Sequence, residues 1–126
     1  MSDPIEQLSN FDPAVRADAL RELFENANGF PAETCRVNMH LHSFFSFNGE
    51  GWSPTRLAWE AKLNSLYSAA VCDFDVLHGC EEFLDAADVL QLRAAVAMET
   101  RVFFADYADV DINSPGEPGV FYFMGM

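Results

Sequence analysis

The sequence predicts an α/β protein with a parallel sheet, and three observations support this fold class. Apolar runs of strand length alternate with amphipathic segments of about 10 to 15 residues, a pattern typical of right-handed β-α-β units. The run LYSAAVCDF at residues 66–74 is continuously small and apolar, as expected for a strand covered on both faces. Polar residues end three successive strands, and parallel sheets carry their functional sites at the carboxyl ends of strands.

Composition and charge narrow the class of protein. The chain has 126 residues, 50% of them hydrophobic, which is enough for one globular domain with a buried core. Its 20 acidic and 7 basic residues give a net charge of -13, which repels phosphate backbones and anionic lipids. We therefore expect neither nucleic-acid binding through a basic patch nor attachment to a membrane, and an anionic substrate would need a cation as intermediary.

The N-terminus and the cysteines bear on the cellular compartment. The first residues, MSDPIEQLSN, lack the basic start and hydrophobic block of a secretory signal. Cys35, Cys72 and Cys80 form no C-x-x-C pair, so they predict neither a disulfide framework nor a thiolate zinc site. We expect a soluble cytoplasmic protein with reduced thiols inside its core.

Residues 1–35 are expected to form an N-terminal helical segment, and residues 36–126 the α/β part. Asp12 followed by Pro13 is an N-cap with proline in the first turn of a helix. This helix is amphipathic and should end near Gly29.

The first strand is expected over Arg36–Leu41, where apolar and polar residues alternate. The alternation places His40 and His42 on one face with Cα atoms about 6.5 to 7 Å apart, so both imidazoles can reach one cation. An H-x-H pair is equally compatible with two histidines that hydrogen-bond to the backbone at a strand end. The residues that end the next two strands bear on this choice.

The remaining elements continue the alternation. Ser53 and Pro54 open a helix that should run to about Asn64. The later elements are expected in this order: a strand over 66–74, a helix over 79–90, a strand from Leu92 that ends around Glu99, a loop over 105–119 and a fourth strand over 120–126.

Acidic residues end the second and third strands. Asp73 and Asp75 close the second strand and Glu99 closes the third, at the sheet edge where the histidines lie. Unpaired carboxylates beside a buried strand end are costly unless a cation or a hydrogen-bond donor balances them. Imidazole and carboxylate ligands suit zinc, manganese or iron, which neutralise phosphate oxygens and lower the pKa of a bound water. The sequence therefore predicts a divalent metal site.

The stretch from NMHLH to AMETRV resembles the PHP (polymerase and histidinol phosphatase) superfamily in its H-x-H, S-P, D-x-D and late glutamate. The resemblance covers residues 36–126 and implies a distorted (β/α)7 PHP-type barrel, of which this chain holds only about the first half. It also implies a cluster of two or three metals and hydrolysis of a phosphoester by metal-bound hydroxide. The ligands it implies are His40, His42 and Glu99, and the auxiliary positions are Asp73, Asn48 and Asp75.

Three positions depart from the family pattern. Phe74 stands where the family has a ligand histidine in D-H-D, and Asn48 is a neutral, weak oxygen ligand where aspartate or histidine is common. Phe123 replaces a histidine of the fourth strand. His78 is either a substitute ligand or an exposed loop histidine.

The length of the chain also departs from the family. A complete barrel of this kind needs about 200 residues or more, by analogy with the eight-stranded case. We expect either a fragment of a longer protein, inactive by itself, or a short relative that self-associates to cover its sheet edges.

Three functions remain open at this point. The first is a metal-dependent phosphoesterase that acts on a small phosphorylated substrate. The second is a degenerate PHP module with a binding or regulatory role, because the side chains of Phe74 and Phe123 cannot bind a metal. The third is an α/β segment whose polar strand ends are merely solvated.

Overall fold

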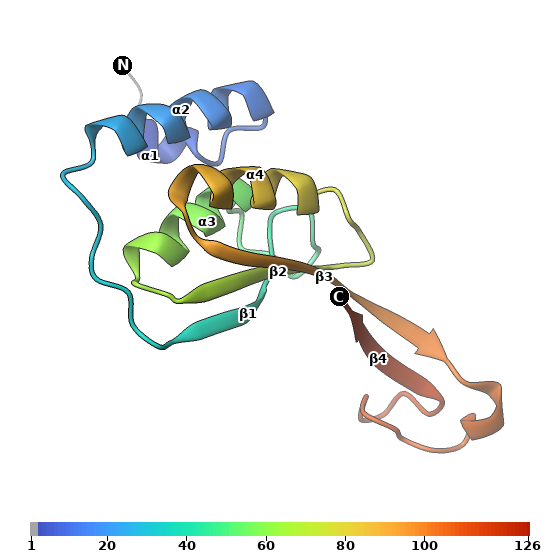
Figure 1. Cartoon of the computed structure of the whole chain (residues 1–126). Coiled ribbons are helices and arrows are strands. Elements are labelled where there is room, and N and C mark those ends of the chain that lie inside the picture. Colours follow the sequence, from blue (N-terminus) through green and yellow to red (C-terminus); the bar gives the residue numbers. More distant parts are fainter. Residues whose placement is uncertain (1–2) are drawn as a thin grey trace.

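A computed structural model describes residues 3–126 as a mixed α/β fold around a four-stranded sheet (Figure 1). The strands lie side by side in sequence order, and β1, β2 and β3 run parallel. β2 lies between two neighbours and is buried along nearly its whole length, as its apolar sequence predicts. The strand bounds are β1 Val37–Leu41, β2 Ser68–Phe74, β3 Arg93–Phe103 and β4 Val120–Gly125.

The helices begin where N-caps and prolines predict. The side chains of Asp12 and Ser53 each accept a hydrogen bond from a backbone N–H of the following turn, at 2.9 and 3.0 Å. A short N-terminal helix, absent from the predicted elements, begins with the same signal at Asp3 and Pro4. The helix bounds are α1 Pro4–Gln7, α2 Pro13–Asn26, α3 Pro54–Leu63 and α4 Cys80–Leu90, with a 3-10 turn η1 at Ala105–Tyr107.

The hydrophobic core lies between the helices and one face of the parallel strands. α3 and α4 pack on this face, and α2 packs on α3 and α4 (Figure 1). The small residues of β2 allow this close approach. Alternation along the strand leaves Cys72 and Phe74 buried on the opposite face of the sheet. The core includes Leu8, Leu20, Leu57, Ala58, Trp59, Ala69, Val71, Phe83, Ala87 and Leu90.

A buried ion pair ties the N-terminal segment to this core. Arg16 on α2 is 3% exposed and binds Glu82 on α4 with two guanidinium nitrogens. Thr55 on α3 donates its hydroxyl to the same carboxylate at 2.7 Å. A paired and hydrogen-bonded carboxylate is tolerated inside a protein, so this network joins three helices.

The fourth strand does not continue the parallel sheet, so the prediction of a parallel sheet is confirmed for β1 to β3 only. β3 runs past Glu99 to Phe103, and β4 returns antiparallel to it, with Val120 opposite Phe103. A parallel connection needs a crossover, usually an α-helix, whereas residues 104–119 form only the 3-10 turn η1 and bends. We call residues 100–125 the hairpin arm, which projects from the body of the molecule (Figure 1).

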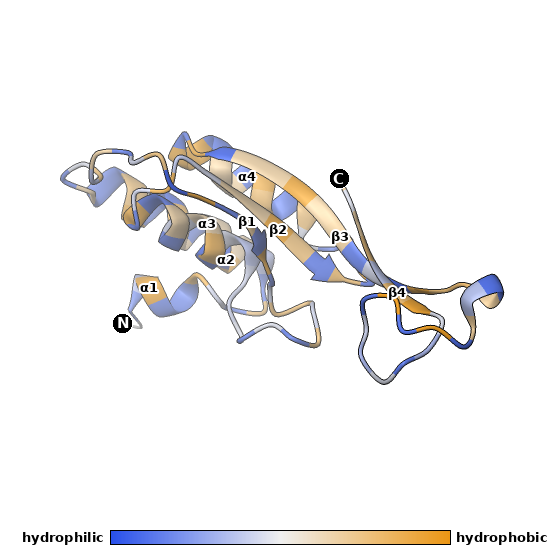
Figure 2. Cartoon of the chain, turned by 90° about the horizontal axis from the view of Figure 1, so that it is seen from below, coloured by the Kyte–Doolittle hydropathy of each residue, from blue (hydrophilic) through white to orange (hydrophobic). Residues whose placement is uncertain are grey.

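The hydropathy of the residues differs between the strands of the sheet and the hairpin arm. β2 and β3 are apolar along most of their length, whereas β1 and the end of β2 carry hydrophilic residues (Figure 2). The hairpin arm exposes large apolar side chains, among them Phe103, Phe104, Tyr107, Phe123 and Met124. Within residues 3–126, no helix has both the length and the apolar character needed to cross a bilayer.

Candidate metal centre

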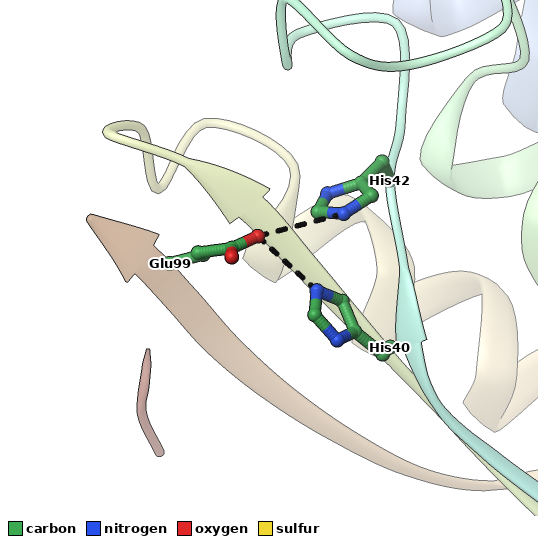
Figure 3. Close-up of side chains that lie close together, drawn as sticks. All are labelled: His40, His42 and Glu99. Atoms are coloured by element: carbon green, nitrogen blue, oxygen red, sulfur yellow. Dashed lines mark hydrogen bonds and ion pairs between the residues drawn. The ribbon is translucent and has the colours of Figure 1, made fainter. Parts of the chain in front are cut away.

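Three side chains, from β1, from the residue after it and from β3, converge on one point of the sheet. His40 Nε2 lies 3.2 Å from Glu99 Oε2, and His42 Nε2 lies 3.6 Å from the same oxygen. The two imidazole rings meet edge to face, with centroids 4.8 Å apart. Figure 3 shows both rings turned toward the Glu99 carboxylate. Their candidate ligand atoms all lie within 4.8 Å of one another, so one ion could contact all three.

An irregularity in β1 accompanies this placement of the histidines. The register against β2 shifts between Asn38 and Leu41, as at a β-bulge. These two residues border the same groove on the α3 side, although strict alternation would separate them. Asn38 Oδ1 accepts the backbone N–H of His40 at 3.1 Å, which fixes the chain at the shift. Bulges commonly re-aim side chains beside functional sites.

Glu99 reaches the histidines across the central strand. It lies within β3 opposite Phe74 of β2, and β1 lies beyond β2, about 9.5 Å away at the usual strand spacing. A small residue on β2 leaves room for long side chains of β1 and β3 to meet above it. Cys72 occupies such a position on β2, and the charge of Glu99 contributes to the raised pKa of its thiol.

Asp73 binds the loop after β1 instead of joining this group. It is 2% exposed and accepts hydrogen bonds from Ser43 N at 2.6 Å and Ser43 Oγ at 2.5 Å. A Cβ added at Gly79 would lie 2.9 Å from Pro54 Cγ and 3.0 Å from Asp73 Oδ2, so a larger residue there would crowd the carboxylate. Asp73 therefore anchors the loop that follows His42.

Asn48 contacts His42 through a chain of hydrogen bonds that begins on β2. The backbone N–H of Phe74 donates to Ser46 Oγ at 3.0 Å, and Ser46 donates in turn to Asn48 Oδ1. Asn48 Nδ2 lies 3.3 Å from His42 Nε2, the nitrogen that faces Glu99. An ion bound to this nitrogen would displace the Asn48 amide, so the amide is a partner of the imidazole in this structure.

Asp75 lies beside Glu99 but turns its carboxylate elsewhere. Its φ of 60° is in the left-handed region, which aspartate tolerates better than most residues. Its backbone N–H donates to Glu99 O at 2.8 Å, and its carboxylate accepts the hydroxyl of Thr100 at 2.5 Å. These bonds tie the residue after β2 to Glu99 and Thr100 of β3.

Phe74, where the family pattern has a ligand histidine, has aromatic surroundings. Phe74 contacts the rings of Phe47 and Tyr122, with centroids at 4.9 and 5.9 Å. Phe123 lies on the hairpin arm and is half exposed. His78 packs on Phe45 at 5.9 Å and is not among the three side chains that converge.

Ser43 and Ser46 are functional positions that the sequence analysis missed. Both are buried within an aromatic loop, and each links that loop to β2. A signal was available, because small hydroxyl residues repeat at this spacing among three phenylalanines in HSFFSFN. Buried hydroxyl groups need hydrogen-bond partners, so such residues predict local anchors.

The two cysteines near this site are protonated thiols at neutral pH. Burial raises the pKa of Cys72, and the charges of Glu99 and Asp73 raise it further. Burial raises the pKa of Cys80 as well, and Asp73 adds to the effect. A protonated thiol is a poor nucleophile and a poor metal ligand, so the chemistry falls to the imidazoles and the carboxylate.

We predict that the free energy of unfolding falls as the pH rises above about 8.5, the usual pKa of an unfolded cysteine. Over that range the unfolded chain releases its thiol protons while the folded chain retains them, so folding is disfavoured. Urea titrations at about pH 7.5 and about pH 9.5 measure the effect, and Cys72→Ala should lose less stability over this interval. An equal loss in the parent protein and the variant would contradict this prediction.

The donor set fits a divalent transition metal. Two imidazole nitrogens and a carboxylate oxygen are ligands that zinc, manganese and iron accept. His42 Nδ1 is buried and has no hydrogen-bond partner among residues 3–126. The other ring nitrogen, Nε2, faces Glu99 and is the one that could bind the ion. His40 is 43% exposed, so the group is open to solvent on one side.

No family model matches the chain, and no curated protein matches it. Among solved structures, the fold is similar to that of a protein from Bifidobacterium adolescentis named a "putative metal-dependent phosphoesterase", with a TM-score of 0.50 and 26% sequence identity. The match covers 62% of this chain and 26% of the Bifidobacterium protein, so the matched part of this chain spans about a quarter of the length of that protein. The similarity supports the resemblance to PHP proteins and is consistent with a partial barrel.

Proposed function

We propose that this chain forms part of a metal-dependent phosphoesterase of the PHP type. In this proposal His40, His42 and Glu99 hold a zinc, manganese or iron ion in the first half of a distorted (β/α)7 barrel. The observation that carries it is the approach of both Nε2 atoms to one Glu99 oxygen, at 3.2 and 3.6 Å. The similarity to a metal-dependent phosphoesterase supports the same class. The substrate is a small phosphorylated molecule.

In this proposal some residues of the site bind the ion, and others hold the loop beside it in place. A bound divalent ion supplies positive charge to a phosphate group and a water of lowered pKa. Three protein ligands leave coordination positions open, as catalytic metal sites do. The exposed side of His40 gives a substrate access. Asp73 holds the loop after β1 through Ser43, the residue that follows His42.

A second candidate is a degenerate PHP module that binds or regulates without catalysis. The contacts of Phe74 with Phe47 and Tyr122 favour it, because phenyl and phenol rings fill the place where the resemblance puts a ligand histidine. Such a site would hold fewer ions than a cluster of two or three. Hydrolysis separates the two candidates.

We predict that the protein hydrolyses 4-nitrophenyl phosphate with manganese or zinc, and that a chelator abolishes the activity. Glu99→Gln keeps the size of the side chain and removes its charge, so it should lower kcat/KM by about 100-fold or more. Glu81→Gln, an exposed change on α4, is the matched control and should leave the rate unchanged. Activity that survives Glu99→Gln refutes a site built on this carboxylate, and metal uptake without hydrolysis favours the degenerate module.

A further inference from the structure

One basic residue lies beside the candidate metal centre. Arg101 is two residues beyond Glu99 on β3, so both side chains leave the same face of the sheet, with Cα atoms about 6.5 to 7 Å apart. Its guanidinium carbon lies 6.0 Å from the centroid of the Phe74 ring, and Phe74 is the register partner of Glu99. The guanidinium therefore leans from β3 toward β2, over the ring beside the Glu99 carboxylate.

The other basic side chains are engaged elsewhere. The chain has seven lysines and arginines, and six of them lie on α2, on α3, just before β1 or at the first residue of β3. A phosphate beside His40, His42 and Glu99 would meet the negative charge of the Glu99 carboxylate. The six distant cations are Arg16, Arg21, Arg36, Arg56, Lys62 and Arg93.

Arg101 is held loosely enough to exchange its partner. Its Nη1 lies 3.3 Å from Glu117 Oε1, and both side chains are about half exposed, at 52% and 41%. Exposed ion pairs of this kind contribute little to stability. Glu117 also accepts the hydroxyl of Ser114, so it keeps a partner when the guanidinium leaves. A dianionic phosphate can replace the single contact to Glu117 with two parallel hydrogen bonds.

We propose that Arg101 binds the terminal phosphate of a phosphate monoester beside the ion held by His40, His42 and Glu99. The guanidinium supplies positive charge over Phe74, a position whose side chain offers no ligand atom. A monoester dianion has non-bridging oxygens for both the ion and the guanidinium. A diester carries only one negative charge, so its attraction to a second cation is weaker. This inference rests on the proposed function and names the substrate class of the same site.

Binding of inorganic phosphate to the manganese-loaded protein, measured by calorimetry, tests the proposal. Arg101→Gln should weaken phosphate binding by about 10-fold or more. Arg101→Lys should restore part of the loss, because lysine returns the positive charge but cannot form two parallel hydrogen bonds as a guanidinium does. Glu117→Gln removes the competing carboxylate and should tighten phosphate binding. Arg21→Gln, which breaks an exposed ion pair on α2, is the matched control and should change nothing.

Metal uptake is measured on the same samples, so the two proposals fail separately. If Arg101→Gln takes up manganese and binds phosphate as the parent does, the role of Arg101 is refuted and the proposed function stands. If the parent takes up no manganese, the proposed function fails, and the same comparison in metal-free protein decides the role of Arg101. Should Arg101→Gln fail to fold, unchanged phosphate affinity in Glu117→Gln would overturn the inference.

Discussion

Replacing His40 with alanine should lower the affinity of the protein for zinc or manganese by about 100-fold or more. Loss of a residue that merely supports a metal ligand already costs about 10- to 100-fold, and His40 would be a ligand itself. Its Nε2 is also the nearer of the two imidazole nitrogens to Glu99, at 3.2 Å. Competition with a coloured chelator measures the affinity, and elemental analysis of the purified protein measures the bound metal.

His78→Ala is the matched control for this experiment. It removes the same side chain from a position that packs on Phe45 and is outside the converging group. We expect this variant to retain the metal affinity of the parent. Equal affinity in His40→Ala and the parent would refute the site, and loss of metal in His78→Ala would make His78 the substitute ligand.

Replacing Asp73 with alanine should lower the free energy of unfolding by about 3 kcal/mol. The buried carboxylate accepts two hydrogen bonds from Ser43, so its loss leaves a buried N–H and a hydroxyl without their acceptor. The experiment is a urea titration in the presence of a chelator, so that bound metal does not add to the stability. Asp18→Ala, an exposed change on α2, should stay within about 0.5 kcal/mol of the parent.

The same pair of variants separates an anchor from a ligand. An anchor at Asp73 predicts a large loss of stability in metal-free protein, together with a looser loop after β1. If Asp73→Ala keeps the stability of the metal-free parent and loses only the metal, Asp73 binds the ion and its role as an anchor is wrong.

Local signals in the sequence predicted most of the parallel part of the fold. Asp12 and Ser53, each followed by proline, mark the starts of α2 and α3, because a short polar side chain caps the first free N–H groups. The continuous apolar run of β2 indicates burial on both faces, and the structure confirms it. These features depend on residues close together in the chain, so one sequence is enough to find them.

The direction of β4 and the shift in β1 depend on contacts that a sequence pattern does not contain. β3 continues past Glu99 because the return strand supplies its hydrogen bonds, from Phe103 opposite Val120 back to Met98 opposite Gly125. The register shift between Asn38 and Leu41 breaks the apolar and polar alternation that the sequence predicts for this strand. Pairing partners far away in the chain decide both features.

The sequence predicted that the candidate ligands lie close together, but not which residues hold the loop beside them. The H-x-H pair and a glutamate two strands later indicate convergence, because parallel strands end at one edge of a sheet, and His40, His42 and Glu99 do lie together. The roles of Asp73 and Asn48 depend on where the loop after β1 folds. Two serines in that loop set its position, and their partners become visible only in three dimensions.

Anomalous diffraction from crystals of the zinc-loaded protein tests the central claim most directly. Our account predicts a zinc peak at bonding distance, about 2.0 to 2.2 Å, from His40 Nε2, His42 Nε2 and a Glu99 oxygen. A zinc-saturated crystal without a peak among these three atoms, or with zinc bound only elsewhere, would contradict it.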